Sequence, residues 1–244
     1  MADLIELDNV SFFANNRQIV RNFTHKFEEG KTTALVGPSG SGKSTILKLA
    51  SGLLVPGAGK ISYRNMNVFN MTRQQLLDFR RESSVVFQDS ALWANQSLLQ
   101  ILELPLRIHF PRMHPTDREN RIQTVLREVG YKRDLSIRPS QLSMGEQKLI
   151  AFASAMMCEP KLLFLDEWIE SLDESAGQRL IHLVQRHQRE QNTVIFVCHD
   201  FRIVKSLADY VLMILGGQFF LKLSRKQLEE DEDLSRYVER GIAS

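Results

Sequence analysis

The stretch Gly37-Pro38-Ser39-Gly40-Ser41-Gly42-Lys43-Ser44-Thr45 matches the phosphate-binding loop pattern G-x-x-x-x-G-K-[ST] at every defined position. Glycines let a backbone turn closely around phosphate oxygens, and amide groups of the loop and of the next helix then point at these anions. The Lys43 ammonium adds a positive charge near the terminal phosphates, and the Ser44 hydroxyl is placed to bind Mg²⁺. The motif therefore predicts a site for a nucleotide polyphosphate.

The sequence on both sides of the loop agrees with this prediction. Residues 31–36 indicate a short buried strand leading into the loop, and residues 46–53 indicate an apolar helix leaving it. Strand, glycine-rich loop and helix, in that order, are the context in which the motif binds phosphate. The alternative is a flexible Gly/Ser linker that contains a lysine, but such a linker would not lie between two apolar elements.

Composition narrows the class of protein. The chain has 244 residues, 43% hydrophobic and 25% charged, which is typical of a globular protein with a core. A net charge of +2 gives no reason to expect nucleic acid as a partner. Cys158 and Cys198 lie in apolar sequence, so we expect buried, free thiols. The N-terminus does not resemble a secretory signal, and no apolar stretch approaches the ~18 residues that span a bilayer. We therefore expect a cytosolic protein that needs a partner to work at a membrane.

Strand and helix patterns alternate along most of the chain. Expected strands are residues 4–13, 19–27, 60–63, 83–87, 161–165 and 193–197, followed by a hairpin of residues 211–215 and 218–221. Expected helices are residues 71–80, 176–191 and two charged segments at the end, and helical patterns dominate from 89 to 159. Within that region Thr116 and Glu119 form a capping-box pattern, which predicts a helix that begins after Thr116 and ends at Gly130. Buried strands alternating with helices predict an α/β fold with a mostly parallel sheet covered on both faces.

Polar groups that could bind a ligand or take part in catalysis follow four of these strands. They are the phosphate loop, Gln88, the pair Asp166 and Glu167, and His199. The carboxyl ends of parallel strands meet at one edge of a sheet, so we expect the four groups to lie together. Asp166 would help to hold Mg²⁺, and Glu167 would accept a proton from, or orient, an attacking water. Taken alone, the acidic pair and Gln88 are also typical of ordinary polar turns, and a lone histidine is usually structural or solvated; the position of His199 at this edge favours a sensor of the γ-phosphate.

In its motifs, their order and their spacing, the chain resembles the ATPase subunits of ABC transporters over essentially its full length. The resemblance rests on the loop, Gln88 (the Q-loop), the signature Leu142–Gln147, the Walker B strand Leu162–Glu167, the D-loop Ser171–Asp173 and the switch histidine His199. It implies a P-loop NTPase fold of ABC type with an antiparallel β subdomain and an inserted helical subdomain. The ATP-binding core would comprise residues 1–88 and 160–244, and the helical subdomain residues 89–159.

The resemblance also implies residue roles and partners. Lys43, Gln88, Glu167 and His199 would be catalytic, and Ser44, Gln88 and Asp166 would hold Mg²⁺ beside ATP. Two copies would pair head to tail, so that each ATP lies between one copy's loop and the other copy's signature and D-loop, with contacts from Ser143, Gly145, Glu146, Gln147 and Asp173. ATP-driven closure of this dimer would move a membrane permease, which would contact the chain near Gln88 on the cytoplasmic face of the inner membrane.

Several positions depart from the family pattern. Met144 replaces the first glycine of the signature, which predicts slower ATP turnover. Ala14 stands where an adenine-stacking aromatic residue is usual, so we expect Phe13, or else Phe12, to stack on adenine; core packing of both rings is the alternative. Trp168 follows the catalytic glutamate in place of a proline, and Leu149 and Ser154 replace arginines.

Residues 87–93, 104–107 and 233–242 resemble the ATPases of Mla/Mce phospholipid transporters. That resemblance implies phospholipid transport, a substrate-binding or MCE-type partner, and a tail that holds the second ATPase or a small regulatory subunit. The alternatives are an importer ATPase for another substrate, or a soluble ABC ATPase that assists assembly or repair without a permease.

Overall fold

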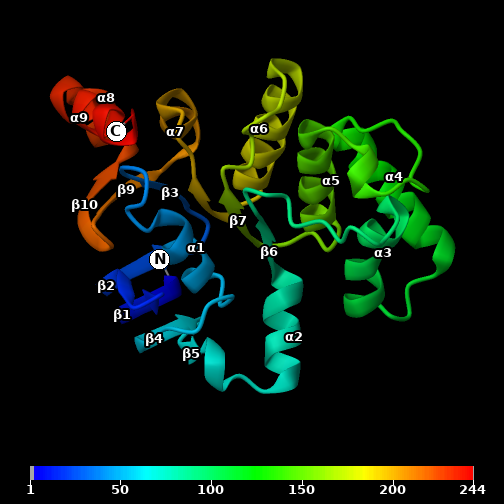
Figure 1. The fold of residues 1–244 in the computed structure, drawn as a ribbon, viewed down its shortest axis with the longest axis horizontal. Helices are drawn as coiled ribbons and strands as arrows, with labels where there is room; N and C mark the ends of the chain where they lie inside the picture. Colours follow the sequence, from blue (N-terminus) through cyan, green and yellow to red (C-terminus); the bar gives the residue numbers. More distant parts are fainter. Residues whose placement is uncertain (1–2, 244) are drawn as a thin grey trace.

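The computed structural model describes residues 3–243, whose strands form two sheets (Figure 1). The larger sheet has the strand order β10-β9-β3-β8-β7-β6. Its members are β3 (Thr32–Val36), β6 (Ser83–Val86), β7 (Leu162–Asp166), β8 (Thr193–Val197), β9 (Tyr210–Leu215) and β10 (Gln218–Ser224). All pairings are parallel except that of β9 with β10, which form the predicted hairpin. β3, β7 and β8 are buried along their whole length, as strands covered on both faces must be. The prediction of a mostly parallel sheet is confirmed.

The smaller sheet is antiparallel, with the order β2-β1-β4-β5. Its strands are β1 (Asp3–Ala14), β2 (Arg17–Glu28), β4 (Ala58–Tyr63) and β5 (Met66–Asn67). Helix α1 (Lys43–Ala50), which begins inside the phosphate loop, contacts β1 and β2 on one side and β7 and β8 on the other. Ile46, Leu47 and Leu49 of α1 are fully buried in the core between the two sheets. This packing fixes the start of α1 against the edge where the larger sheet's strands end.

Helices form a second core on the other face of the larger sheet. They are α5 (Met144–Met156), α6 (Glu174–Arg189), α7 (Phe201–Leu207), α8 (Arg225–Glu230) and α9 (Glu232–Ala243). α3 (Leu98–His109) and α4 (Pro115–Val129) pack on α5 and on each other, to one side of the sheets (Figure 1). This helical group agrees with a predominance of helix after residue 89, whereas subdomain boundaries at residues 89 and 159 stay a prediction.

Local sequence signals explain most helix ends, with one correction. Thr72 caps α2 (Arg73–Glu82), and Ser97 caps α3, each through a capping box with a glutamine three residues on. The predicted box at Thr116 is wrong: α4 begins at Pro115, and His114 is its N-cap. Proline is favoured at the first helical position because its missing N–H has no partner there in any case. Thr116 therefore lies inside the first turn.

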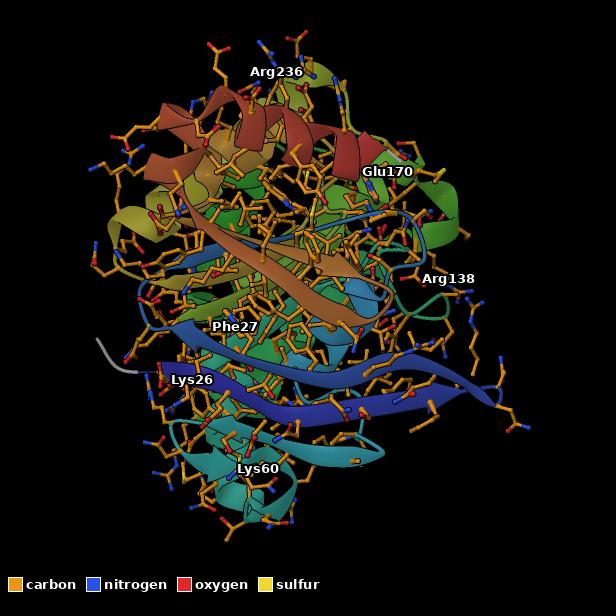
Figure 2. All side chains as sticks on the ribbon, turned by 90° about the vertical axis from the view of Figure 1, so that its left-hand side faces the viewer. Lys26, Phe27, Lys60, Arg138, Glu170 and Arg236 are labelled. Atoms are coloured by element: carbon orange, nitrogen blue, oxygen red, sulfur yellow. The ribbon has the colours of Figure 1, made fainter. Side chains whose placement is uncertain are left out.

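Charged side chains surround the outside of the protein (Figure 2). Lys26 of β2 and Arg236 of α9 form ion pairs that are largely exposed, and such pairs contribute little stability. Cys158 and Cys198 are both free thiols, as expected, but only Cys198 is fully buried, whereas Cys158 is partly exposed. Desolvation raises the pKa of each to about 11. Among the described residues, no helix is long and apolar enough to cross a membrane.

Candidate nucleotide-binding site

Four neighbouring strands of the larger sheet carry the predicted site residues at one edge. The phosphate loop follows β3, His199 follows β8, Asp166 and Glu167 end β7, and Gln88 follows β6. These strands are adjacent and parallel, in the order β3-β8-β7-β6. The structure therefore brings the four groups together, as the sequence predicted.

The backbone of the phosphate loop requires glycine at two positions. Gly37 has a φ of +143°, and a Cβ there would lie 2.2 Å from the carbonyl oxygen of Ile214. Gly42, at φ +97°, is the N-cap of α1, so the helix begins directly at the loop. Directly after Gly42, the buried Lys43 donates from its Nζ to the carbonyls of Gly37 at 2.7 Å and Pro38 at 2.9 Å. The loop and its lysine form one hydrogen-bonded unit at the positive end of a helix.

Lys43 and Asp166 have pKa values shifted in opposite directions by the same cause. Desolvation lowers the pKa of Lys43, and the carboxylates of Glu167 and Asp166 oppose that shift. Desolvation also raises the pKa of Asp166, opposed first by a hydrogen bond from Ser44 and then by nearby lysines. Each buried charge is thus stabilised mainly by the other groups of the site.

Ser44 and Asp166 fit a magnesium ion. The Ser44 hydroxyl donates to Asp166 Oδ1 at 2.8 Å, so both oxygens already lie within reach of one point. Mg²⁺ prefers such hard oxygen ligands and takes most of its remaining ligands from phosphates and water. The donor set therefore suits Mg²⁺ held jointly by protein and nucleotide.

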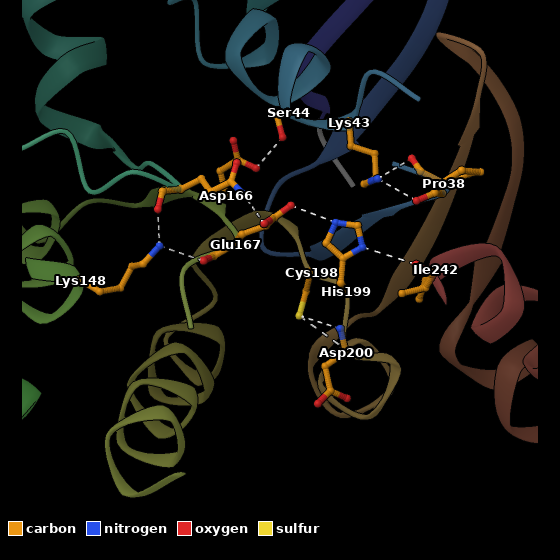
Figure 3. Close-up of polar contacts among 12 residues, drawn as sticks. Pro38, Lys43, Ser44, Lys148, Asp166, Glu167, Cys198, His199, Asp200 and Ile242 are labelled. Carbon is orange, nitrogen blue, oxygen red and sulfur yellow. Dashed lines mark hydrogen bonds and ion pairs between the residues drawn. The ribbon is translucent and has the colours of Figure 1, made fainter. Parts of the chain in front are cut away.

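Glu167 is the centre of the polar network (Figure 3). Its Oε2 accepts a hydrogen bond from Gln88 Nε2 at 2.6 Å, and its Oε1 lies 2.9 Å from His199 Nε2. Its backbone has a φ of +46°, which is unfavourable for a side chain of this size and occurs mainly where surrounding contacts impose it. Desolvation, then Glu170, raises the pKa of Glu167. A raised pKa makes this carboxylate a better proton acceptor near neutral pH.

These groups line a pocket of about 480 Å³. Its lining includes Ser39, Gly40, Lys43, Ser44, Gln88, Glu167 and His199, together with Arg17, Gln18, Ile19 and Arg21 of β2 and Gly216 of the hairpin. The β2 residues were not predicted. Only the packing of the smaller sheet against α1 brings them to the loop, and a lone arginine at a strand start gives no local signal.

The two aromatic candidates for adenine stacking lie elsewhere on β1. The Phe13 ring is 54% exposed and lies beside Gly57, where an added Cβ would come within 3.2 Å of it. Phe12 packs against the core between the sheets. Neither is among the described residues that line the nucleotide pocket, and the stacking role of Phe13 stays a prediction.

Signature residues begin α5, away from the phosphate loop of the same chain. Ser143 caps α5 in a capping box with Glu146, whose carboxylate also pairs with Arg133 at 2.9 Å. Gly145 lies against the D-loop, since a Cβ there would be 3.0 Å from the Ser171 carbonyl oxygen. Met144 is 72% exposed. Together with Gln147, Met144 lines a second pocket of about 250 Å³, which shares Gln88 with the nucleotide pocket.

Two other departures from the family pattern, Trp168 and Leu149, have structural explanations in the core. Trp168 is fully buried, with its ring centroid 5.7 Å from that of Phe152, so it fills the core beneath α5. Leu149 is buried in the same core. Asp173 caps α6 by accepting from the Ala176 amide at 2.9 Å, and its contact with nucleotide stays a prediction.

Comparison with known proteins identifies the family. Residues 20–170 match the family model described as ABC transporter. The chain belongs to the ABC transporter family. It is an ABC transporter ATP-binding subunit and an ATPase, with the fold expected from its sequence.

Relatives cover most of this ABC cassette. It is 31% identical over 239 residues to the intermembrane phospholipid transport ATP-binding protein MlaF of Haemophilus influenzae, covering 95% of this chain and 88% of MlaF. It is 34% identical to the nickel import ATP-binding protein NikE of Brucella suis, covering 87% and 81%. The uncharacterized ABC transporter ATP-binding protein YejF of Escherichia coli is 35% identical over 82% of this chain, which spans 38% of YejF. The dimeric structure of the cassette MJ0796 bound to ADP and Pi superposes with a TM-score of 0.83 at 25% identity, covering 91% of this chain and 99% of that one.

Proposed function

We propose that this chain works as a head-to-tail homodimer whose ATP-driven closure moves a membrane permease that transports phospholipid. The observation that supports a dimer is that the phosphate loop and the signature, which together would form one ATP site, line different pockets of the same chain. The phosphate loop lines one pocket, and the signature residue Met144 lines another, so a second copy is needed to bring a signature to the loop. The dimeric form of the similar cassette MJ0796 supports this arrangement.

Within the proposed dimer, each residue has a defined role. The loop amides and Lys43 bind the phosphates, while Ser44, Asp166 and Gln88 hold Mg²⁺, which neutralises phosphate charge. Glu167 accepts the proton of the attacking water, and Gln88 and His199 hold its carboxylate in position through their contacts at 2.6 and 2.9 Å. Ser143 and Gly145 of the second copy contact the terminal phosphate.

A dilution experiment tests the dimer. We expect nucleotide binding per chain to be independent of protein concentration, and ATP turnover per chain to fall when the protein is diluted below its dimerisation constant. Sedimentation velocity at the same concentrations gives the fraction of dimer. Turnover that is independent of that fraction would overturn the proposal.

A groove beside Gln88 supports contact with a permease. It has a volume of about 450 Å³ and lies between α3, the segment before it and the end of α5, and its lining includes Phe87, Leu92, Trp93, Leu104, Pro105 and Ile108. Trp93 is 60% exposed at its rim. An apolar groove of this size suits an amphipathic helix of a membrane partner, which we place on the cytoplasmic face of the inner membrane. Contact there would move Gln88 and, through it, Glu167.

Co-purification from native membranes tests this coupling. We expect a polytopic membrane protein to co-purify with the tagged chain in mild detergent, and to be lost with the variant Trp93→Ala, whose ATP binding remains intact. The variant Phe220→Ser changes an exposed aromatic residue on β10, at the opposite edge of the larger sheet from β6 and the groove, and is the matched control. A native protein that carries no membrane partner would favour the soluble assembly or repair factor.

The substrate is the finer part of the proposal. MlaF covers more of this chain than NikE does, and that coverage favours phospholipid over another imported substrate. An MCE-type protein and a small regulatory subunit would then be further partners. Reconstitution of the purified complex into liposomes with a fluorescent phospholipid tests this. ATP-dependent movement of the lipid supports the proposal, and ATP-dependent uptake of nickel without lipid movement replaces it.

A further inference from the structure

Lys148 is a buried lysine for which the site described so far has no use. It lies one turn into α5, directly after the signature, and its side chain is only 4% exposed. Taking an ammonium group out of water is costly unless hydrogen bonds replace the lost hydration. A lysine kept at such a position calls for a specific set of acceptors.

Both acceptors of Lys148 belong to the catalytic network (Figure 3). Its Nζ donates to the backbone carbonyl of Gln88 at 2.5 Å and to that of Glu167 at 3.1 Å. The side chains of the same two residues meet each other at 2.6 Å. Lys148 therefore closes a loop of contacts that joins the helical group, the Q-loop and the end of β7.

The contact with Glu167 acts on its unfavourable backbone conformation. A φ of +46° is unfavourable for a glutamate, so this conformation depends on contacts that hold the residue in place. Both backbone polar groups of Glu167, the N–H and the C=O, make such contacts. Its N–H donates to the Val197 carbonyl of β8 at 3.1 Å, and its C=O accepts from Lys148 Nζ at 3.1 Å and, at 3.3 Å, from the Glu170 N–H. β8 and α5 thus hold the two ends of the residue whose carboxylate faces Gln88 and His199.

The acidic residues around Lys148 favour its protonated, positively charged form. Desolvation lowers the pKa of Lys148, while Glu170, Glu167, Asp166 and Asp89 act in the opposite direction. Among residues 3–243, Lys148 forms no ion pair within 4.0 Å, so its hydrogen bonds go to main-chain oxygens while its charge is balanced at longer range. Such an arrangement fixes backbone position without neutralising the Glu167 carboxylate.

We propose that Lys148 is a positioning residue that sets the orientation of Glu167 and transmits movement of the signature helix to it. When α5 shifts as the dimer closes, Lys148 carries the Gln88 and Glu167 carbonyls with it, so the carboxylate reaches its working position only with the signature in place. This inference rests on the proposed role of Glu167 as proton acceptor.

The variant Lys148→Met removes the ammonium and keeps an unbranched side chain of similar length. We expect kcat for ATP hydrolysis to fall about 10- to 100-fold, because a displaced catalytic group has a cost of this size. The KM for ATP and the affinity for a fluorescent ATP analogue should stay within about threefold, since the loop is untouched. A purely structural role would instead lower thermal stability and affect both parameters or neither.

Arg121→Met is the matched control. Arg121 of α4 also donates to two consecutive backbone carbonyls, those of Met156 and Met157, but these lie at the other end of α5 from Glu167. We expect this variant to lose thermal stability at least as much as Lys148→Met and to keep the wild-type kcat. An equal loss of kcat in both variants, or an unchanged kcat in Lys148→Met, would overturn the inference.

The variant Glu167→Gln distinguishes a failure of the inference about Lys148 from a failure of the proposed role of Glu167 as proton acceptor. If Glu167→Gln is inactive and Lys148→Met retains the wild-type kcat, the role of Lys148 is wrong and the role of Glu167 stands. If Glu167→Gln itself retains turnover, both are wrong.

Discussion

The Ser44 hydroxyl donates to Asp166 across 2.8 Å and so joins the phosphate loop to a strand two places away in the sheet. The two residues are 122 positions apart in the chain, and only the parallel order β3-β8-β7 brings them together. Because both are hard oxygen donors and Ser44 lines the nucleotide pocket, this pair is where we expect magnesium dependence to originate.

The variant Asp166→Asn should separate metal binding from nucleotide binding. It keeps the shape of the side chain and removes the charge, so Mg²⁺-dependent affinity for a fluorescent ATP analogue should fall at least about tenfold, as for loss of a charged ligand. Affinity measured in excess EDTA should not change. Asp117→Asn, which alters a carboxylate in the first turn of α4, is the control. Equal Mg²⁺ dependence in Asp166→Asn and wild type would contradict the assignment.

Met144→Gly should raise ATP turnover. The Met144 side chain is 72% exposed on the first turn of α5, at the surface that would face the loop of a second copy. Removing it frees space for closer approach, so we expect kcat to rise about three- to tenfold, which corresponds to about 0.7–1.4 kcal/mol of barrier. Met144→Leu keeps the bulk and should match the wild type. Steady-state phosphate release measures all three, and equal rates would show that Met144 does not slow closure.

Arg17 and Phe13 can be compared as nucleotide contacts. Arg17 lines the pocket, while Phe13 lies beside Gly57 outside it. A guanidinium can bind phosphate or stack on a base, so Arg17→Ala should weaken ATP-analogue binding about tenfold. Equilibrium titration of Phe13→Ala then decides the stacking prediction made from the sequence: a comparable loss supports stacking on adenine, and an unchanged affinity argues against it.

His187 should make the folded state sensitive to mild acid. It is buried in α6, its Nδ1 lies 3.3 Å from the Asn192 amide, and its Nε2 has no hydrogen-bond partner among residues 3–243. Desolvation, with a smaller effect from Arg186, lowers its pKa from 6.5 to about 4. Between these values the unfolded chain binds a proton that the folded chain does not, so the free energy of unfolding falls as pH falls from 6.5 to 4. The loss amounts to about 3 kcal/mol from this one group.

Urea unfolding at several pH values tests this sign. His187→Leu should show a flatter dependence of unfolding free energy on pH than the wild type across this window. His182→Gln, at an exposed position on the same helix, should keep the wild-type slope. A wild-type slope in His187→Leu would assign the acid sensitivity to other groups, of which His25 is the first candidate because its pKa is also lowered to about 4.

Much of the fold and the polar centre of the site could be predicted because the signals are local. Strands β3, β7 and β8 are short apolar runs. The residue types that follow them indicate phosphate binding, metal binding and proton transfer. The exact start of α4 was missed because Pro115 and His114 compete with a better-known capping pattern at Thr116.

Other features could not be predicted because they depend on tertiary packing. Arg17 reaches the pocket only because α1 holds the smaller sheet against the loop. In the sequence, Lys148 is an ordinary polar residue after the signature. Its acceptors are main-chain oxygens of two segments distant in the chain, and a pattern of side chains cannot predict such contacts. Trp168 stands where the family pattern has proline, and only the structure reveals the core space that it fills.

The two free cysteines have a practical consequence for following closure in solution. A thiol whose pKa is about 11 is ionised to only about one part in 10⁴ at pH 7, so Cys158 and Cys198 should react very slowly with maleimides. A single exposed cysteine, introduced for example by Met66→Cys on β5, should then accept a fluorophore or spin label selectively in the otherwise native chain. Distances between labels on two copies would report dimer closure directly during the ATP cycle.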